Sequence, residues 1–347
     1  MNVIEILNTI RDNASATYQD RIPEATRTNL ESIRYAMIDD DNIMVANEFM
    51  STLLNKLVKS TVHVKLFSNP LKSLKKGKKP LGDTVEEIYN NFLKGEKFDA
   101  TGANLLNRKL PDTKTVYHRM NYQQKYKVTV SQQVLSKAFA SYDALESYIT
   151  SIINSLYNSA ELDEFMNMKQ LIASALTKKA MKIVDVADPL ASEANGKEFI
   201  KAVKTVSGLM TFPSAEHNAY LTAQDTDDVP ITTFTRKNEQ ILILDTATDT
   251  SVSVDVLAAL FNMSVAEFND TRKIVIDAFP DVTVDGTKRT IRGALVDEAF
   301  FQMYDDLFVI KAFDNPEGLY QNYILHVHQT QAFSILVNAV AFAVEAA

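Results

Sequence analysis

The feature that most constrains the fold is a long segment with helically spaced apolar residues, from about Asp143 to Thr177. No Gly or Pro interrupts it, and Asp143 with Glu146 has the spacing of a capping box. A continuous helix of this length would be roughly 50 Å long, whereas the mean globular helix has about 11–12 residues. We therefore expect a structural spine, which most small enzymes do not need. Its apolar positions are Ile149, Ile152, Ile153, Leu156, Ala160, Met168, Leu171, Ile172 and Ala175.

Bulk composition excludes several classes of protein. The 347 residues are 46% hydrophobic, which is ample for one elaborate domain or two or three smaller ones. A net charge of −8 argues against a general nucleic-acid coat. The absence of cysteine excludes disulfides, thiolate metal sites and cysteine nucleophiles.

Two apolar segments bear on targeting. The N-terminal segment lacks the basic start and apolar centre of a secretory signal. The most apolar segment, Ala332 to Val344, is too short for a membrane span and is typical of a buried core element. We expect a soluble protein without a membrane partner, intracellular where it is made.

Charge is distributed unevenly along the chain. Residues 56–79 contain eight lysines and no acid, so this lysine-rich segment carries +8 and the remainder −16. Three interpretations stay open: it binds phosphate backbone, it meets an acidic patch on another subunit, or it is simply solvated. Phe67 is the only nearby aromatic residue, which disfavours stacking of single strands. The opposite charge elsewhere makes a self-complementary contact attractive.

The other patterns indicate an α+β chain with no repeat and no βαβ alternation. Residues 1–55 have short helical stripes, typical of an arm that packs on something else. Residues 80–130 indicate an extended hairpin with few core residues, and the stability of such a hairpin on its own would be marginal. Strands are expected at Tyr126–Val130, Ile241–Leu244, Lys273–Phe279 and Tyr320–Val327, helices around Phe199–Val206 and Val254–Phe261, and a hairpin turn at Asp285-Gly286.

Three motifs could carry chemistry, and each is weak. Gly77 to Thr84 has the glycine spacing of a phosphate loop, but Asp83 occupies the essential lysine position and Pro80 removes a backbone donor. His326 and His328 share one face of an expected strand but lack a third ligand.

A carboxylate cluster is the third motif. It is more typical of a solvated or ion-paired helix face than of acid–base catalysis. Its members are Glu161, Asp163 and Glu164. From the residues alone, an arm, a hairpin and a spine without a convincing catalytic site favour an assembly protein.

Four long stretches resemble the major capsid (head) proteins of phi-29-like tailed bacteriophages. They occur in that family's order and span most of the chain. The stretches are NPLKSLKKGKKPLGDTVEEIY (Asn69–Tyr89), SIINSLYNSAELDEF (Ser151–Phe165), VDVLAALFNMSVAEF (Val254–Phe268), and GLYQNYILHVHQT with the following NAVAF (Gly318–Phe342).

The resemblance implies the HK-97-like capsid fold, an α+β fold with five regions. These are an N-terminal arm (1–60), an extended hairpin loop with flanking strands (61–130), a peripheral domain with the spine helix (131–180), an axial domain (181–312) and a C-terminal return to the peripheral domain (313–347) by a strand and a helix. The hairpin loop would reach over an adjacent subunit. Resembling proteins can carry a further C-terminal immunoglobulin-like domain, which we expect to be missing after Ala347.

The implied function is a non-enzymatic shell subunit without cofactor or metal. It would assemble into hexamers and pentamers of an icosahedral or prolate head, with a scaffolding protein, a portal and packaged double-stranded DNA as partners. The protein would be part of the virion, and it would be synthesised in the cytoplasm of the host bacterium. We expect the contacts between subunits to involve Lys72, Lys75, Lys76, Lys78, Lys79, Glu86 and Glu87. The alternatives are an encapsulin-like compartment shell and, less favoured, a metal-dependent hydrolase.

Overall fold

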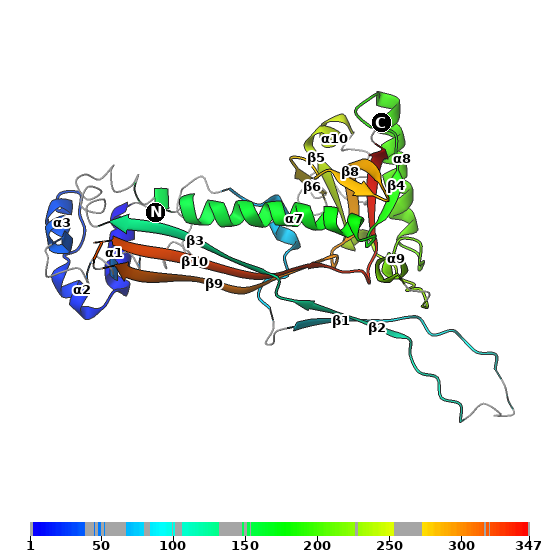
Figure 1. Ribbon diagram of the computed structural model, residues 1–347, viewed down its shortest axis with the longest axis horizontal. Helices are drawn as coiled ribbons and strands as arrows, with labels where there is room; N and C mark the ends of the chain where they lie inside the picture. Colours follow the sequence, from blue (N-terminus) through cyan, green and yellow to red (C-terminus); the bar gives the residue numbers. More distant parts are fainter. Residues whose placement is uncertain are drawn as a thin grey trace. The chain divides into compact units, whose positions relative to one another are not determined.

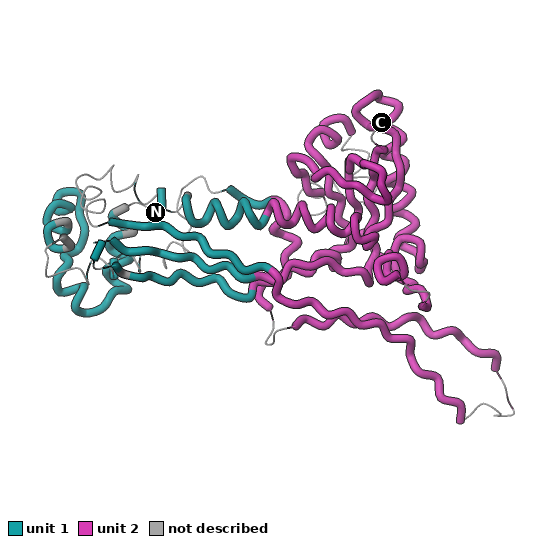
Figure 2. Tube along the Cα trace, in the orientation of Figure 1, with its two compact units in different colours: residues 1–69, 122–164, 306–328 teal, residues 70–121, 165–305, 329–347 magenta. Residues whose placement is uncertain are grey.

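The computed structural model describes residues 3–38, 67–79, 84–98, 106–131, 154–225, 228–252, 273–315 and 320–345, and between these ranges residues 45, 48, 49, 52, 100, 148, 151, 152, 317 and 318. The chain forms two compact units (Figure 2). Unit 1 comprises residues 1–69, 122–164 and 306–328, and unit 2 comprises residues 70–121, 165–305 and 329–347. The boundaries of the two units do not coincide with the five contiguous regions expected from the sequence. The division into those five regions stays a prediction.

Unit 1 combines three short helices with strands that are distant in the sequence. The helices are α1 (Val3–Asn13), α2 (Ala16–Arg21) and α3 (Leu30–Ile38). The strands are β3 (Tyr122–Ser131), β10 (Tyr320–Phe333) and β9 (Phe301–Asn315), which form a sheet in the order β3-β10-β9 (Figure 1). The last two strands also contribute residues to unit 2.

The described part of the N-terminal region is packed within unit 1. Leu7 and Ile10 of α1 are buried in one cluster with Tyr323 and Leu325 of β10. We expected an arm that packs on something else, and the described part of α1 packs on a strand of the same chain. The apolar stripe predicted the helices correctly, but a stripe does not identify the surface that covers it.

The spine helix is confirmed over its described part. A π-helical turn, η3 (Asn154–Asn158), precedes α7 (Ser159–Thr177). Residues 143–147, 149, 150 and 153 of the predicted helix lie outside the described residues. The π turn was not predicted, because apolar spacing does not distinguish one helical hydrogen-bond pattern from another over a single turn.

Unit 2 is built on a mixed sheet with both faces covered. The strand order is β4 (Lys182–Asp185), β11 (Ala339–Glu345), β8 (Thr287–Asp297), β5 (Gln240–Asp245) and β6 (Lys273–Ile276), and β7 (Val282–Val284) pairs with β8. The helix α8 (Glu193–Leu209) packs on one face and the unit 2 part of α7 on the other. The short helices α9 (Tyr220–Gln224) and α10 (Thr246–Ser251) complete the unit.

The central strand β5 explains why the sheet needs two helical layers. All six of its residues are buried. Ile241 and Ile243 lie in the core that contains α7, whereas Leu242 and Leu244 lie in the core that contains α8. Alternate side chains of a strand point to opposite faces, so a continuous apolar run requires cover on both.

Most local predictions in unit 2 are confirmed. The helix at Phe199–Val206, the strands at 241–244 and 273–276 and the turn at Asp285-Gly286 are all present. Asp285 and Gly286 have φ of 50° and 81°, as a two-residue hairpin turn requires. The helix expected at Val254–Phe261 lies outside the described residues.

The predicted C-terminal helix is wrong. Residues 339–345 form strand β11, which lies between β4 and β8 in unit 2. A short apolar run without a polar face fits a buried helix or a buried strand equally well. Here the run is a strand, because it pairs with β4 on one side and with β8 on the other.

Candidate assembly surface

Residues 70–79 of the lysine-rich segment belong to unit 2. Its 3-10 helix η2 (Pro70–Leu74) buries Leu71 and Leu74 in the core. Gly77, with φ of 87°, then turns the chain so that its carbonyl accepts from Asp305 N at 2.8 Å. The backbone NH of Lys79 donates to Asp305 O at 3.0 Å. The described half of the phosphate-loop-like motif is therefore an ordinary turn on β9.

Several lysines of this segment have partners inside unit 2. Lys75 forms an ion pair of 2.7 Å with Asp305. Lys76 Nζ donates to the Glu298 carbonyl at 3.1 Å, and Lys79 Nζ contacts Thr330 Oγ1 at 3.5 Å. Lys72 and Lys78 are exposed. Lys56, Lys59 and Lys65 lie outside the described residues.

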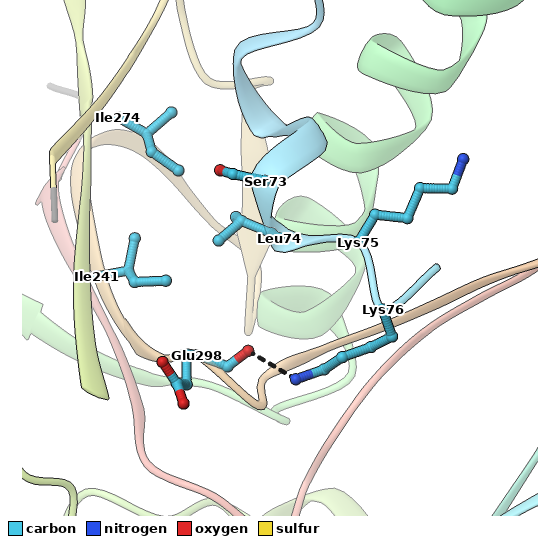
Figure 3. Close-up of a pocket in the computed structure, with 7 residues that line it drawn as sticks. All are labelled: Ser73, Leu74, Lys75, Lys76, Ile241, Ile274 and Glu298. Carbon is cyan, nitrogen blue, oxygen red and sulfur yellow. Dashed lines mark hydrogen bonds between the residues drawn. The ribbon is translucent and has the colours of Figure 1, made fainter. Parts of the chain in front are cut away.

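A cavity of about 260 Å³ opens beside this segment (Figure 3). Leu74, Ile241 and Ile274 supply apolar lining, and the close-up shows the Lys76 ammonium reaching the Glu298 backbone at its edge. Ser73 and Lys75 complete the lining. The cavity lies in unit 2, and the titratable residues of its lining are Lys75, Lys76 and Glu298.

The predicted hairpin is present. Strand β1 (Thr84–Asn90) pairs antiparallel with β2 (Thr113–Arg119), from Thr84 opposite Arg119 to Asn90 opposite Thr113. Figure 1 shows the two arms continuing beyond these strands, away from the sheet of unit 2. Three apolar side chains on the arms are almost fully exposed: Phe98 (91%), Leu106 (91%) and Leu110 (84%).

The two faces of the paired strands differ. Glu86 and Tyr117 lie opposite each other on the exposed face, where Tyr117 Oη donates to Glu86 Oε1 at 3.0 Å. Glu87 lies on the inner face: its carboxylate contacts His118 Nε2 at 3.0 Å and accepts from Ser334 Oγ at 2.6 Å. Of the two glutamates expected at a contact between subunits, only Glu86 is exposed.

The base of the hairpin (residues 84–92 and 112–119, here called the root) contacts a loop of unit 2 (residues 228–234, here called the root loop). Tyr89 Oη donates to the Thr232 carbonyl at 2.6 Å, and Asn91 Oδ1 accepts from Thr232 N at 2.9 Å. Phe92 stacks on Phe234, with ring centroids 6.4 Å apart. The predicted site residues did not include these groups, because nothing in local spacing relates the two segments.

A lysine between two carboxylates adds ion pairs to the contacts at the root. Lys114 Nζ lies 2.6 Å from Asp228 Oδ2 and 3.0 Å from Asp112 Oδ1. The hydrogen bond to Asp228 is the main reason why the pKa of Lys114 is raised. The same bond lowers the pKa of Asp228, so all three groups are charged at neutral pH.

The histidine pair and the carboxylate cluster both lie in unit 1. His326 and His328 are half-buried on β10, with ring centroids 6.4 Å apart. Glu164 is buried within 3.4 Å of Asn69 Nδ2 and Asp163 accepts from Tyr126 Oη, so this cluster is only partly the solvated face that we expected. Within the described ranges, no group of three or more His, Asp or Glu side chains could hold a metal.

None of the helices in the described part of the chain combines the length and hydropathy that a membrane span requires.

Solved structures identify the fold. The chain is similar to a chain in the capsid structure of Staphylococcus phage Andhra, with a TM-score of 0.63, 13% identity and coverage of 83% of this chain and 87% of that one. It is also similar to a chain in a structure of native bacteriophage P68, with a TM-score of 0.58, 12% identity and coverage of 82% and 86%. The fold is that of the HK-97-like capsid proteins of tailed bacteriophages.

Sequence relatives identify the family. Residues 7–343 match the Phi29-like phage major capsid protein family, and the chain belongs to this family. It is 33% identical to the major capsid protein of Bacillus phage PZA over 342 residues, which are 97% of this chain and 72% of that protein. It is 27% identical to that of Streptococcus phage Cp-1 over 351 residues, 96% of this chain and 92% of that protein. The protein is therefore a major capsid protein, a structural component of the virion.

Proposed function

We propose that this protein assembles with itself into hexamers and pentamers that build an icosahedral or prolate head around double-stranded DNA. The observation that supports this most is the hairpin. Phe98, Leu106 and Leu110 are exposed on arms that have no core of their own in the described residues. Exposed apolar groups of this kind mark contact sites, and a shell gives every subunit neighbours to cover them.

The proposal includes further partners and a purely structural role. A scaffolding protein would direct assembly, a portal would occupy one vertex, and the lysine-rich segment with Glu86 would contribute to contacts between subunits. Synthesis would take place in the host cytoplasm, and no catalysis is needed at any step. Family membership favours a phage head over a cellular compartment or a hydrolase.

Electron microscopy tests the proposal. We expect the protein, produced with the scaffolding protein of its phage, to form closed shells whose capsomers have six-fold and five-fold symmetry. Heads purified from infected cells should yield double-stranded DNA on extraction. A chain that stays monomeric at high concentration with its scaffold, or shells that hold an enzyme instead of DNA, would contradict it.

A further inference from the structure

The exposed side of α8 carries a row of three lysines. Lys197, Lys201 and Lys204 are all exposed and follow the i, i+4, i+7 spacing that places residues on one side of a helix. The opposite side of the helix buries Phe199 and Val203 against the sheet of unit 2. The lysine row is about 10 Å long, at 1.5 Å per residue.

Positive charge is only partly compensated along this row. Lys197 forms an ion pair of 2.7 Å with Glu193 at the start of the helix. For Lys201 and Lys204, no carboxylate among the described residues lies within ion-pair distance. Glu198 is exposed on the flank of the row, three residues before Lys201 and about 60° around the helix from it, but it forms no ion pair with Lys201.

A fourth lysine, Lys237, is half-buried beside the last turn of the helix. Lys237 Nζ donates to Ser207 Oγ at 2.9 Å, so this ammonium lies against the last turn of α8. Burial and then the nearby charge of Lys204 lower the pKa of Lys237. Placing like charges close together costs free energy, which an anion bound between them would offset.

The composition of the row favours phosphate over protein as its partner. Protein–protein interfaces are enriched in aromatic residues, Met and Arg and depleted of Lys. Exposed aromatic side chains of unit 2 lie elsewhere, for example Phe98 on the hairpin and Phe212 after α8. Lysine carries a point charge on a flexible side chain, and it binds the phosphate backbone whatever the base sequence. This property suits the inner surface of a shell that encloses DNA of any sequence.

We propose that the lysine row of α8 binds the phosphate backbone of the packaged DNA, without sequence preference. This inference rests on the proposed function, because it requires a head that encloses DNA. Each strand of duplex DNA carries one negative charge per about 3.4 Å of the helix axis, so a 10 Å row spans roughly three phosphates of one strand. Each lysine of the row therefore has an available anion.

A single introduced thiol tests which side of the shell the row faces. The chain has no cysteine, so Lys201→Cys provides a unique site for a maleimide coupled to a polymer too large to cross the shell. We expect no labelling of intact DNA-filled heads and complete labelling after the heads are opened with denaturant. Labelling of intact heads would place the row outside and overturn the inference.

A pair of substitutions that removes two positive charges tests the contact itself. In cryo-electron microscopy of filled heads, we expect density joining α8 to the outermost DNA layer, and its loss in the Lys201→Gln/Lys204→Gln variant. The matched control is Lys179→Gln/Lys288→Gln, because these exposed lysines are already paired with Asp285 and Asp281. The control should keep the joining density.

Three further outcomes separate this inference from the proposed function. Failure of the Lys201→Gln/Lys204→Gln variant alone to form heads would make the row a contact between subunits and overturn the inference. The same conclusion follows if no density joins α8 to DNA in wild-type heads. Absence of DNA-filled wild-type heads would instead contradict the proposed function.

Discussion

Gly293 lies in β8 opposite Phe342 of β11 and Leu244 of β5, where an added side chain would be tightly packed. A Cβ atom at this position would lie 3.0 Å from Leu244 Cδ2 and 3.2 Å from Phe199 Cζ. We expect Gly293→Ala to lower the free energy of unfolding by about 1–3 kcal/mol, because overpacking forces the core to move. Denaturant unfolding followed by circular dichroism measures this.

Gly208 in α8 is the matched control, since an added Cβ there meets no atom within 4 Å. Gly208→Ala should stabilise the protein by about 0.5–1 kcal/mol, because alanine loses less backbone entropy in a helix. Equal effects of the two substitutions would show that Gly293 is not at a close approach.

At the scale of elements, the attachment of the hairpin depends on contacts at its root. Tyr89→Phe removes the donor to the Thr232 carbonyl. We expect a loss of about 1 kcal/mol in the free energy of unfolding, with faster hydrogen exchange in the root loop. Tyr117→Phe removes a hydroxyl on the exposed face of the same hairpin and should change neither quantity. Unchanged exchange in Tyr89→Phe would argue that other contacts hold the root.

Elements whose signals are local could be predicted from the sequence. The apolar run of β5, the Asp285-Gly286 turn and the amphipathic α8 each follow from a few adjacent residues. The hairpin root could not be predicted, because its contacts join Tyr89 and Lys114 to residues more than a hundred positions away. Tyrosine hydroxyls and lysines are common, and their spacing does not identify a distant partner.

The lysine-rich segment shows the same limit. Its charge was evident from the sequence, but the internal partners of Lys75, Lys76 and Lys79 depend on the tertiary structure.

At the scale of the whole molecule, assembly should depend on the exposed members of this segment. Lys72→Glu/Lys78→Glu reverses two exposed charges, and we expect it to prevent shell formation through repulsion at the subunit contact. Circular dichroism should show a folded subunit, while sedimentation should show no shells.

Lys75→Gln is the control for folding, because it removes the ion pair with Asp305 and should lower subunit stability instead. Normal shells from Lys72→Glu/Lys78→Glu would refute the contact role of these two lysines.

The position of β11 also determines when the subunit can finish folding. In the described sheet β4 pairs with β11, and β11 in turn pairs with β8, so residues 339–345 join strands that leave the ribosome much earlier. A nascent polypeptide therefore cannot complete this sheet until translation has passed position 345. Non-local pairing of this kind delays folding.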